Sequence, residues 1–355
     1  MIALFRHDIT ILQFPAFNTQ TFHDVIPLKP MDTTPRRAML IVNPVSGTRD
    51  KAALPDIVGC VLSGMGCRLE VRNTKAPSDA SAFTEEAVRA GFDVVVAAGG
   101  DGTVNEVASS LRGTRTALAI IPCGSGNGLA RTLGIPPDFT AAARLLSDGK
   151  TIACDNGLVN GRPFFCTCGM GFDAEVSRRF ASERRRGRMT YVKNAILDYP
   201  GYAPQAYALS IGGRVITENA FLIAVCNASQ YGNNAYIAPK ASLTDGLLDV
   251  IVFHTGSLIR TALAGVELFT GHLDRNMLVD SFRVSEVSIS RLKEGAAHID
   301  GEPVELGKRL DISVEAANIR IVVPASMPEF KPIISPLRSL ITDISSDIRF
   351  ALGFT

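Results

Sequence analysis

Two glycine-rich loops, each preceded by a short apolar run and followed by a helix-forming stretch, constrain the fold of this chain most. The first loop, residues 99–103 (GGDGT), follows the apolar run 94–98, and the second, residues 124–127 (GSGN), follows the run 117–121. Short apolar runs bounded by glycine are typical of buried strands. A strand, a loop and a helix in this order direct free N–H groups and a positive dipole end at an anion. The pair of loops therefore predicts a site that holds and transfers phosphate.

Composition narrows the class of protein. The 355 residues are enough for two domains, and the 46% of apolar residues can form a large core. The net charge of +1 gives no reason to expect nucleic acid as a partner. Seven cysteines without metal-like spacing favour a reducing cytosol, where Cys166 and Cys168 are buried thiols. We expect neither an export signal nor a membrane span.

Strands alternate with helices through the first part of the chain. Residues 1–35 are mixed in character and predict a loosely ordered extension. From there to residue 150, the alternation predicts a doubly wound α/β domain with a parallel sheet. Its ligand should lie beyond the carboxyl ends of the strands, where the loops at 43–47, 99–103 and 124–127 fall. The other elements expected in this domain are strands at 38–42 and 68–72 and helices at 51–62, 79–90 and 140–146.

The regular alternation of strands and helices ends after residue 150. Asn160-Gly161 and Gly212-Gly213 are hairpin signals, and they predict a mostly antiparallel β-sandwich domain over 151–330, packed beside the first domain. Residues 331–355 form a tail with helical apolar spacing, and we favour a helix docked on the protein over a membrane-surface helix. The elements expected in the second domain are strands at 221–226, 248–253, 283–290 and 312–323 and helices at 174–186 and 258–269.

Four motifs in order, NPVSG at 43–47, GGDGTVNE at 99–106, GSGN at 124–127 and DGEP at 300–303, resemble the diacylglycerol kinase and sphingosine kinase family of lipid kinases. The resemblance covers residues 36–324. It implies that the first domain binds ATP with Mg²⁺, that the β domain helps to hold lipid and that the last strands return to the first domain. Since we expect no membrane span and see no strong basic patch, we expect a cytoplasmic enzyme that visits the inner membrane surface transiently to reach a membrane lipid. The sequence does not decide whether the protein is a homodimer.

Three carboxylates are candidates for the chemistry. Asp101 lies beside the expected phosphates, where it could accept the proton of the substrate hydroxyl, hold Mg²⁺ through water or cap a helix. Asp300 and Glu302 lie on an Asp-Gly turn between two strands. That turn needs no function to explain it, but Glu302 matches the position of the proton acceptor in bacterial diacylglycerol kinases. The sequence leaves open which carboxylate is the base.

The nucleotide site is expected to be built mainly from backbone. Glycines let the main chain approach phosphate closely, and no Gly-x4-Gly-Lys-Ser/Thr loop is present. Glu106 fits two interpretations equally: a capping box with Thr103, or a side chain near nucleotide or metal, which the resemblance favours. The dense arginine run 184–188 is either a solvated helix end or a source of phosphate contacts. Including those implied by the resemblance, the candidate nucleotide-binding residues are Asn43, Pro44, Ser46, Gly47, Thr74, Gly99, Gly100, Gly102, Thr103, Asn105, Glu106, Gly124, Ser125, Gly126, Asn127 and Arg188, with Arg184 less favoured.

Two further segments carry candidate ligands. Residues 169–174 (GMGFDA) fit a dinucleotide fingerprint, but they follow hairpins rather than open a βαβ unit, so we discount NAD there. By resemblance this segment lies near the lipid headgroup, with Glu175 at the place of a substrate-binding acid and Phe172 beside it. Residues 242–247 resemble a structural Mg²⁺ loop, with Asp245 as the anionic ligand and oxygens of Ser242 and Leu247 as helpers. A plain Asp-Gly turn is nearly as well supported. His298 is expected to be a partly buried strand residue.

The sequence thus predicts an ATP- and Mg²⁺-dependent lipid kinase acting on a primary hydroxyl of diacylglycerol, a sphingoid base or ceramide. The GSGN form of the second loop favours a sphingoid base as the acceptor. An apolar slot for lipid would draw on Phe164, Phe165, Met170, Phe172 and Phe180, which could equally be core. The alternatives are a kinase with a soluble acceptor, of the NAD kinase type, and a catalytically idle lipid carrier.

Overall fold

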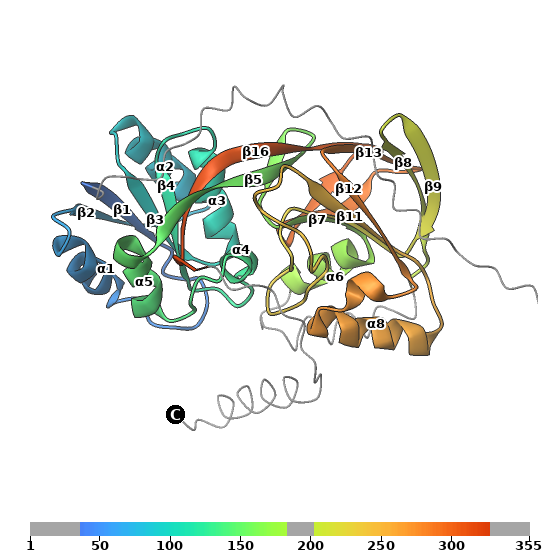
Figure 1. Cartoon of the computed structure of the whole chain (residues 1–355), viewed down its shortest axis with the longest axis horizontal. Coiled ribbons are helices and arrows are strands. Elements are labelled where there is room, and N and C mark those ends of the chain that lie inside the picture. Colours follow the sequence, from blue (N-terminus) through green and yellow to red (C-terminus); the bar gives the residue numbers. More distant parts are fainter. Residues whose placement is uncertain (1–35, 183–201, 327–355) are drawn as a thin grey trace, which may run out of the picture.

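A computed structural model describes residues 36–182 and 202–326, which form two domains connected by two long strands (Figure 1). The first domain contains four parallel strands in the order β2-β1-β3-β4. β3 and β4 are buried at every position, as their uninterrupted apolar sequences predict. The predicted parallel α/β domain is therefore confirmed. The strands are β1 (Arg37–Val42), β2 (Arg68–Asn73), β3 (Val94–Gly99) and β4 (Ala117–Pro122).

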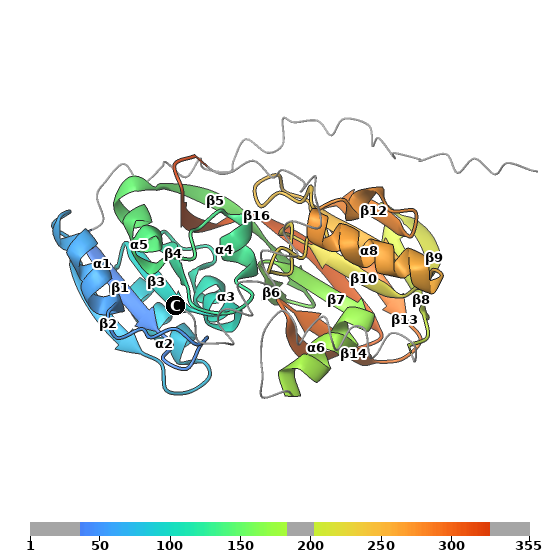
Figure 2. The ribbon, with the colours of Figure 1, turned by 90° about the horizontal axis from the view of Figure 1, so that it is seen from below.

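Helices pack in pairs against this sheet. α1 (Leu54–Ser63) contacts α5 (Phe139–Asp148), and α2 (Asp79–Arg89) contacts α3 (Asp101–Leu111) (Figure 2). A short helix, α4 (Gly128–Thr132), follows the second glycine loop. α1 begins later than the predicted residue 51, because a proline occupies its first turn. Lys51 instead lies buried before the helix and donates to the carbonyl oxygens of Pro44 and Arg49.

The second domain is a sandwich of two antiparallel layers, as predicted. A six-stranded sheet has the order β12-β11-β10-β7-β14-β15, and it faces the part of the larger sheet that contains β13, β8 and β9. Buried side chains from both sheets form one core between them. The strands of the six-stranded sheet are β7 (Thr167–Gly171), β10 (Leu222–Cys226), β11 (Leu248–Phe253), β12 (Val279–Val284), β14 (Gly295–Ile299) and β15 (Glu302–Leu306). The facing strands are β6 (Arg162–Phe164), β8 (Gln205–Ile211), β9 (Arg214–Ala220) and β13 (Glu286–Arg291).

Two strands, β5 (Lys150–Val159) and β16 (Arg309–Val323), belong to both domains (Figure 1). They pair with each other along their length, with a register shift between Glu315 and Ile319. β16 also pairs with β13 near its start and runs parallel to β4 near its end, at Ile321 opposite Leu118. One continuous sheet therefore extends through both domains and fixes how they sit relative to each other.

Turn chemistry is confirmed at both predicted hairpins, where Asn160 and Gly161 join β5 to β6 and Gly212 and Gly213 join β8 to β9, all with positive φ. The single strand predicted at 283–290 is wrong. The chain divides at Ser285 into β12, which pairs with β11 in one sheet, and β13, which pairs with β8 and β16 in the other. An uninterrupted β-like pattern does not reveal a strand that changes sheets.

Two helices cover the outer face of the six-stranded sheet, α6 (Phe172–Ser182) and α8 (Leu258–Thr270) (Figures 1 and 2). Side chains alternate along the strands: Val250 and Val252 point into the sandwich core, and Ile251 and Phe253 join the cluster beneath these helices. Within residues 36–182 and 202–326, helices are all too short or too polar to cross a membrane.

Candidate active site

Three loops meet at the carboxyl edge of the parallel strands, as the sequence predicts for ligand-binding loops. A Cβ on Gly124 would lie 2.7 Å from the Cα of Gly100, and one on Gly47 would lie 1.8 Å from the carbonyl oxygen of Cys123. Gly47 also has a φ of +64°. Backbone therefore packs directly on backbone here, which only glycine permits. The NPVSG, GGDGT and GSGN loops thus lie against one another at this edge, in contact through main-chain atoms.

The hydroxyl of Ser46 lies at these loops without a hydrogen-bond partner among the described residues, and its Oγ is buried. It lies 4.0 Å from the position that a Cβ on Gly100 would take. A buried hydroxyl without a partner is costly, and the first-turn amides of α3 are free of intrahelical acceptors. Both kinds of donor fit the phosphate groups of ATP.

The first turn of α3 is linked to the first loop by side chains. The Nδ2 of Asn43 donates to the Oγ1 of Thr103 at 2.9 Å, and the Oδ1 of Asn43 accepts from the amide of Val45 at 3.1 Å. Gly99 is required because a Cβ there would lie 2.4 Å from that of Thr103. Thr74 is buried at the end of β2, where its amide donates to the carbonyl of Val42.

The capping-box interpretation of Glu106 is wrong. α3 begins at Asp101 with Gly100 as its N-cap, so Thr103 lies inside the helix rather than before it. The Oε1 of Glu106 instead accepts from the amide of Ser78 at 3.3 Å. Glu106 thus faces the loop between β2 and α2, on the same side as Thr74.

Asp101 connects the two glycine loops. Its carboxylate accepts from the amides of Asn127 and Gly128, each at 2.8 Å, and so caps the start of α4 rather than α3. Burial raises the pKa of the Asp101 carboxyl above its ordinary value, and the charge of Asp300 adds to the rise, whereas the two amides lower it. Gly126 is needed here because a Cβ would lie 2.7 Å from the Oδ2 of Asp101.

The side chain of Asn127 stabilises its own loop. It accepts from the amide of Gly124 at 3.0 Å and donates to the carbonyl of the same residue at 2.7 Å, while its backbone has a φ of +52°. Ser125 is exposed at the tip. The GSGN sequence is therefore explained by loop closure and by the close approach to Asp101.

Asp300 holds the β14–β15 turn against the rest of the site. Its carboxylate accepts from three successive amides, those of Phe165, Cys166 and Thr167, at 2.7–2.9 Å. It also accepts from the Nδ2 of Asn105 on α3 at 2.8 Å. Burial raises the pKa of Asp300, although these hydrogen bonds lower it. Four donors leave this carboxylate little capacity for substrate, so its geometry is that of a positioning group.

Glu302, by contrast, reaches the first glycine loop from the other domain. The residue is exposed, and its Oε1 lies 3.7 Å from the position of a Cβ on Gly102. Asp300 and Gly301 form the turn before it with φ of +49° and +85°. The turn therefore directs a solvent-accessible carboxylate toward the start of α3. Of the two carboxylates in this motif, Glu302 is the one with room for a substrate hydroxyl.

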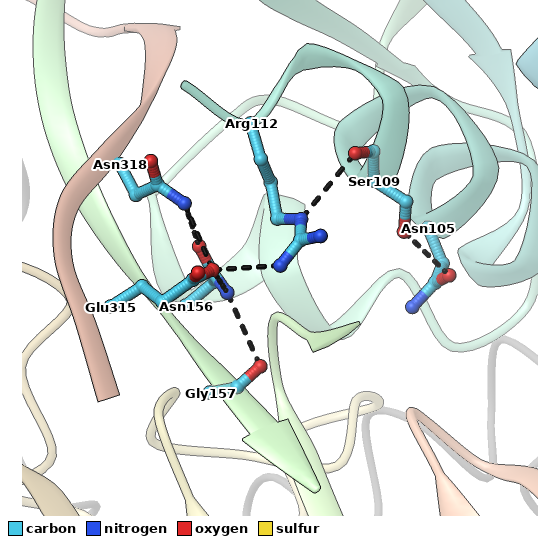
Figure 3. Close-up of polar contacts among 7 residues, drawn as sticks. All are labelled: Asn105, Ser109, Arg112, Asn156, Gly157, Glu315 and Asn318. Carbon is cyan, nitrogen blue, oxygen red and sulfur yellow. Dashed lines mark hydrogen bonds and ion pairs between the residues drawn. The ribbon is translucent and has the colours of Figure 1, made fainter. Parts of the chain in front are cut away.

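Polar side chains also hold α3 against the strands that join the domains (Figure 3). The Nη1 of Arg112 pairs with the Oε2 of Glu315 on β16 at 2.7 Å. The same oxygen accepts from Asn156 and Asn318, each at 2.9 Å. α3 thus contacts the shared strands at its end and the Asp300 turn, through Asn105, near its start.

A buried polar group behind the turn was not predicted from the sequence. The Nε2 of His298 lies 3.1 Å from the Oδ2 of Asp173, which also accepts from the hydroxyl of Tyr231 at 2.9 Å. The Nδ1 of His298 accepts from the amide of Gly301 at 3.4 Å. His298 lies on a strand, as expected, but it is fully rather than partly buried and is linked to the turn that carries Glu302. The only sequence signal for this contact was Asp173, an acidic residue in the first turn of α6.

The described residues predicted to contact lipid have partners within the protein itself. Glu175 on α6 pairs with Arg178 one turn later. Phe172 is buried against Phe221 and Tyr202 with ring centroids 4.4 and 5.4 Å apart. Phe164, Phe165 and Met170 are fully buried core residues. Because β7 belongs to an antiparallel sheet, the GMGFDA segment does not open a dinucleotide-binding unit. Arg184, Arg188 and the side chain of Phe180 lie outside the described residues.

The predicted metal loop already has a cationic partner. The carboxylate of Asp245 accepts from the amide of Leu247 at 3.1 Å and forms an ion pair with Arg283. The hydroxyl of Ser242 accepts from the amide of Thr244. In the described part of the chain, no three His, Cys, Asp or Glu side chains are grouped to hold a metal. A Mg²⁺ ion bound by Asp245 would have to displace Arg283, so these residues fit it poorly, and a metal here stays a prediction.

Comparison with known proteins agrees with this architecture. The family model of the diacylglycerol kinase catalytic domain matches residues 37–159, and that of the YegS C-terminal NAD kinase beta sandwich-like domain matches residues 166–323. A Pseudomonas aeruginosa (strain UCBPP-PA14) protein named probable lipid kinase YegS-like is 32% identical to this chain. The alignment covers 74% of this chain and 87% of the relative. A diacylglycerol kinase of Bacillus subtilis (strain 168) is 28% identical over 75% of this chain and 90% of its own.

The fold is also shared with a solved structure. The crystal structure of a putative diacylglycerol kinase from Bacillus anthracis str. Sterne superposes with a TM-score of 0.71 at 24% identity, over 83% of this chain and 98% of that one. Both matched domains, the two glycine loops and the carboxylate turn occur here in one continuous order. The chain therefore belongs to the diacylglycerol kinase family of lipid kinases.

Proposed function

We propose that this protein transfers the γ-phosphoryl group of ATP to the primary hydroxyl of diacylglycerol in a membrane. The observation that carries the proposal is the approach of Glu302 to the first turn of α3, beside a buried hydroxyl and amides that are suited to phosphate. Phosphoryl transfer needs positioning and charge neutralisation more than covalent chemistry. The two sides of this site divide those tasks between the domains.

The α/β domain holds the nucleotide in this proposal. The Oγ of Ser46, the first-turn amides of α3 and the glycine loops bind phosphate oxygens, and Thr74 and Glu106 line the adenine side. Mg²⁺, when bound with ATP, neutralises charge on the phosphates. Asp101 links the two glycine loops beside the expected phosphates, so it is the carboxylate that would hold the ion through water.

The β domain supplies the base. Glu302 accepts the proton of the acceptor hydroxyl as that oxygen attacks the γ-phosphorus. Asp300 orients Glu302 by fixing the turn, and the pair of Asp173 and His298 supports the turn from behind. A positioned base of this kind contributes about a hundredfold or more to the rate.

Diacylglycerol is the acceptor favoured over a sphingoid base. The GSGN form of the second loop favoured a sphingoid base in the sequence analysis. In the structure this loop sequence is explained by the hydrogen bonds that close the loop and by its close approach to Asp101. It therefore carries no information about the acceptor. The relative from Bacillus subtilis named diacylglycerol kinase, aligned over nine-tenths of its length, supports diacylglycerol.

Transfer of labelled γ-phosphate from ATP to a panel of diacylglycerol, sphingosine, ceramide and NAD tests this proposal. We expect label in phosphatidic acid, dependent on Mg²⁺ and absent from NAD. Label in NAD without label in any lipid would replace the proposal with a soluble-acceptor kinase. Absence of transfer to every acceptor, with ATP still bound, would favour an idle lipid carrier.

A further inference from the structure

The outer helix of the β domain presents an apolar row to solvent. Ile259, Leu263 and Val266 on α8 are 74%, 56% and 48% exposed, and they are spaced at i, i+4 and i+7. This spacing places them on one side of the helix. We call these three residues the α8 face. A surface helix normally turns its apolar stripe inward and its polar residues outward, so the α8 face needs an explanation.

The inner side of α8 is apolar as well. Ala264 is buried, and Leu268 packs on the cluster that covers the six-stranded sheet. The α8 face is therefore additional apolar surface that the fold of this domain does not use. Met277, which is 85% exposed, lies just after the short 3-10 helix η3 (Leu273–Arg275) that contacts α8. Exposed apolar rows of this kind mark an interaction surface.

Charge around the α8 face identifies the kind of partner. On α6, α8 and η3 as described, every exposed charged residue is an arginine: Arg178, Arg179, Arg260 and Arg275.

The acidic residues of these elements are less exposed and have partners. Glu267 accepts from Asn276, Asp274 pairs with Lys240, and Glu175 pairs with Arg178. α6 and α8 lie on the same side of the β domain (Figures 1 and 2). An apolar row flanked by arginines is complementary to an anionic bilayer, in which acyl chains lie beneath phosphate groups.

We propose that the α8 face is the surface by which this enzyme docks on an anionic lipid bilayer. The proposal rests on the proposed function, because a kinase of long-chain diacylglycerol must reach its acceptor in a membrane. Ile259, Leu263 and Val266 enter the interfacial region, and Arg260 and Arg275 contact phosphate groups. The α8 face belongs to the same helical layer as α6. α6 begins at Phe172, whose side chain packs in the apolar cluster beneath this layer.

Vesicle binding by the full-length protein tests this proposal without requiring turnover. The probes are phosphatidylcholine vesicles with and without phosphatidylglycerol, and binding is measured by co-sedimentation. We expect wild type to bind the anionic vesicles and Leu263→Asp to bind them about tenfold more weakly, because a carboxylate replaces a membrane-facing leucine. Leu292→Asp is the matched control, since Leu292 is 79% exposed on a turn elsewhere, and it should bind as wild type does.

Activity on two forms of the acceptor gives a second readout. Leu263→Asp should lose about tenfold in rate on long-chain diacylglycerol in vesicles and keep its rate on dispersed dihexanoylglycerol. Melting curves of all variants confirm that they fold. Equal vesicle binding by wild type and Leu263→Asp, or no binding by wild type, would overturn the proposal. So would a wild-type dimer that Leu263→Asp converts to monomer. Vesicle binding that depends on Leu263, without phosphorylation of any lipid, would retain the docking face and reject the proposed function.

Discussion

The two sides of the active site are built by different means. On the α/β side, main chain packs on main chain, and Gly47 and Gly124 allow three loops to meet with few charged groups. On the β side, the turn carrying Glu302 is fixed by side chains, above all by Asp300 and its four donors. The proposed nucleotide side is thus built from main chain, whereas the proposed catalytic side is a carboxylate held at the end of a hydrogen-bonded turn.

This difference has a functional consequence. Amide donors on a rigid backbone suit a ligand that has the same form in every turnover, such as a nucleotide phosphate. A proton acceptor must instead keep free lone pairs, so a second group has to do the positioning. Asp300 is saturated and Glu302 is exposed, which separates the two tasks within three residues. Changes on the two sides should therefore affect different measurable quantities.

The largest effect is expected from breaking the β side at Asp300. Asp300→Asn replaces an acceptor oxygen with an NH₂ group facing backbone amides, so at least one buried donor loses its partner. We expect the free energy of unfolding to fall by about 3 kcal/mol. Chemical denaturation followed by circular dichroism measures it. Asp311→Asn, at an exposed carboxylate on β16, is the control and should change stability by less than about 0.5 kcal/mol. An Asp300→Asn protein as stable as wild type would remove Asp300 as the main support of the turn.

Asp249 sharpens the comparison, because it is a buried β-domain carboxylate without such a set of amides. Burial raises its pKa to about 6, with Asp245 adding to the rise and Arg283, 3.6 Å away, opposing it. Since the folded pKa lies above the unfolded value, the folded state holds the proton more tightly. Its contribution to stability is present at low pH and is lost as pH rises from about 4 through about 6.

Asp249→Asn should remove that loss, which we expect to be about 2 kcal/mol or less. Unfolding free energies of wild type and Asp249→Asn, measured at about pH 4.5 and about pH 7, give the difference between the two slopes. Other buried carboxylates are common to both proteins and cancel in this difference. Identical slopes would mean that Asp249 titrates at its ordinary pKa.

Filling the α/β side should change nucleotide affinity rather than stability. Gly100 has an extended backbone, and a Cβ there would lie 3.4 Å from the Cα of Gly124, so Gly100→Val is tight but compatible with the fold. Its branched side chain occupies the space facing Ser46. We expect ATP binding, measured by calorimetry, to weaken about tenfold or more. Gly307→Val, at a position with open space around its Cβ, is the control. Unchanged ATP affinity in a folded Gly100→Val protein would move the nucleotide away from these loops.

The smallest effect is expected at Asp245. Its ion pair with Arg283 is partly exposed, so Asp245→Ala should cost less than about 1 kcal/mol. Because Arg283 already neutralises this carboxylate, we expect added Mg²⁺ to shift the melting temperature of wild type and Asp245→Ala equally. A Mg²⁺-dependent rise in wild type alone would establish the metal site that the loop sequence suggests.

Local sequence patterns were sufficient for most of the elements and for the meeting of the glycine loops at one edge of the sheet. The glycine loops could be predicted because strand, glycine and helix signals lie within a few residues of one another. The division at Ser285 could not, since both halves have a strand-like pattern and only pairing with β11 or with β8 and β16 distinguishes them. The Glu106 capping box failed because α3 begins two residues earlier than Thr103.

The β side was less accessible to sequence reasoning, because its hydrogen bonds join distant residues. Asp300 bonds to Asn105 and to the amides of 165–167, which are separated from it by more than 130 positions. The contact of His298 with Asp173 spans 125 positions. Such contacts appear only when the β14–β15 hairpin lies against β7 and α6. The motif therefore identified both carboxylates of the turn but not that Asp300 accepts from four donors while Glu302 is exposed.

The most direct test of this division of tasks is to measure turnover and ATP affinity together in Glu302→Gln. This substitution keeps the size of the side chain and removes the proton acceptor, while Asp300 still holds the turn. We predict a kcat for diacylglycerol about a hundredfold or more below wild type, with the Kd for ATP changed less than about twofold and the melting temperature unchanged. A near-normal kcat, or a loss of ATP affinity as large as the loss of turnover, would contradict the assignment of Glu302 as the base.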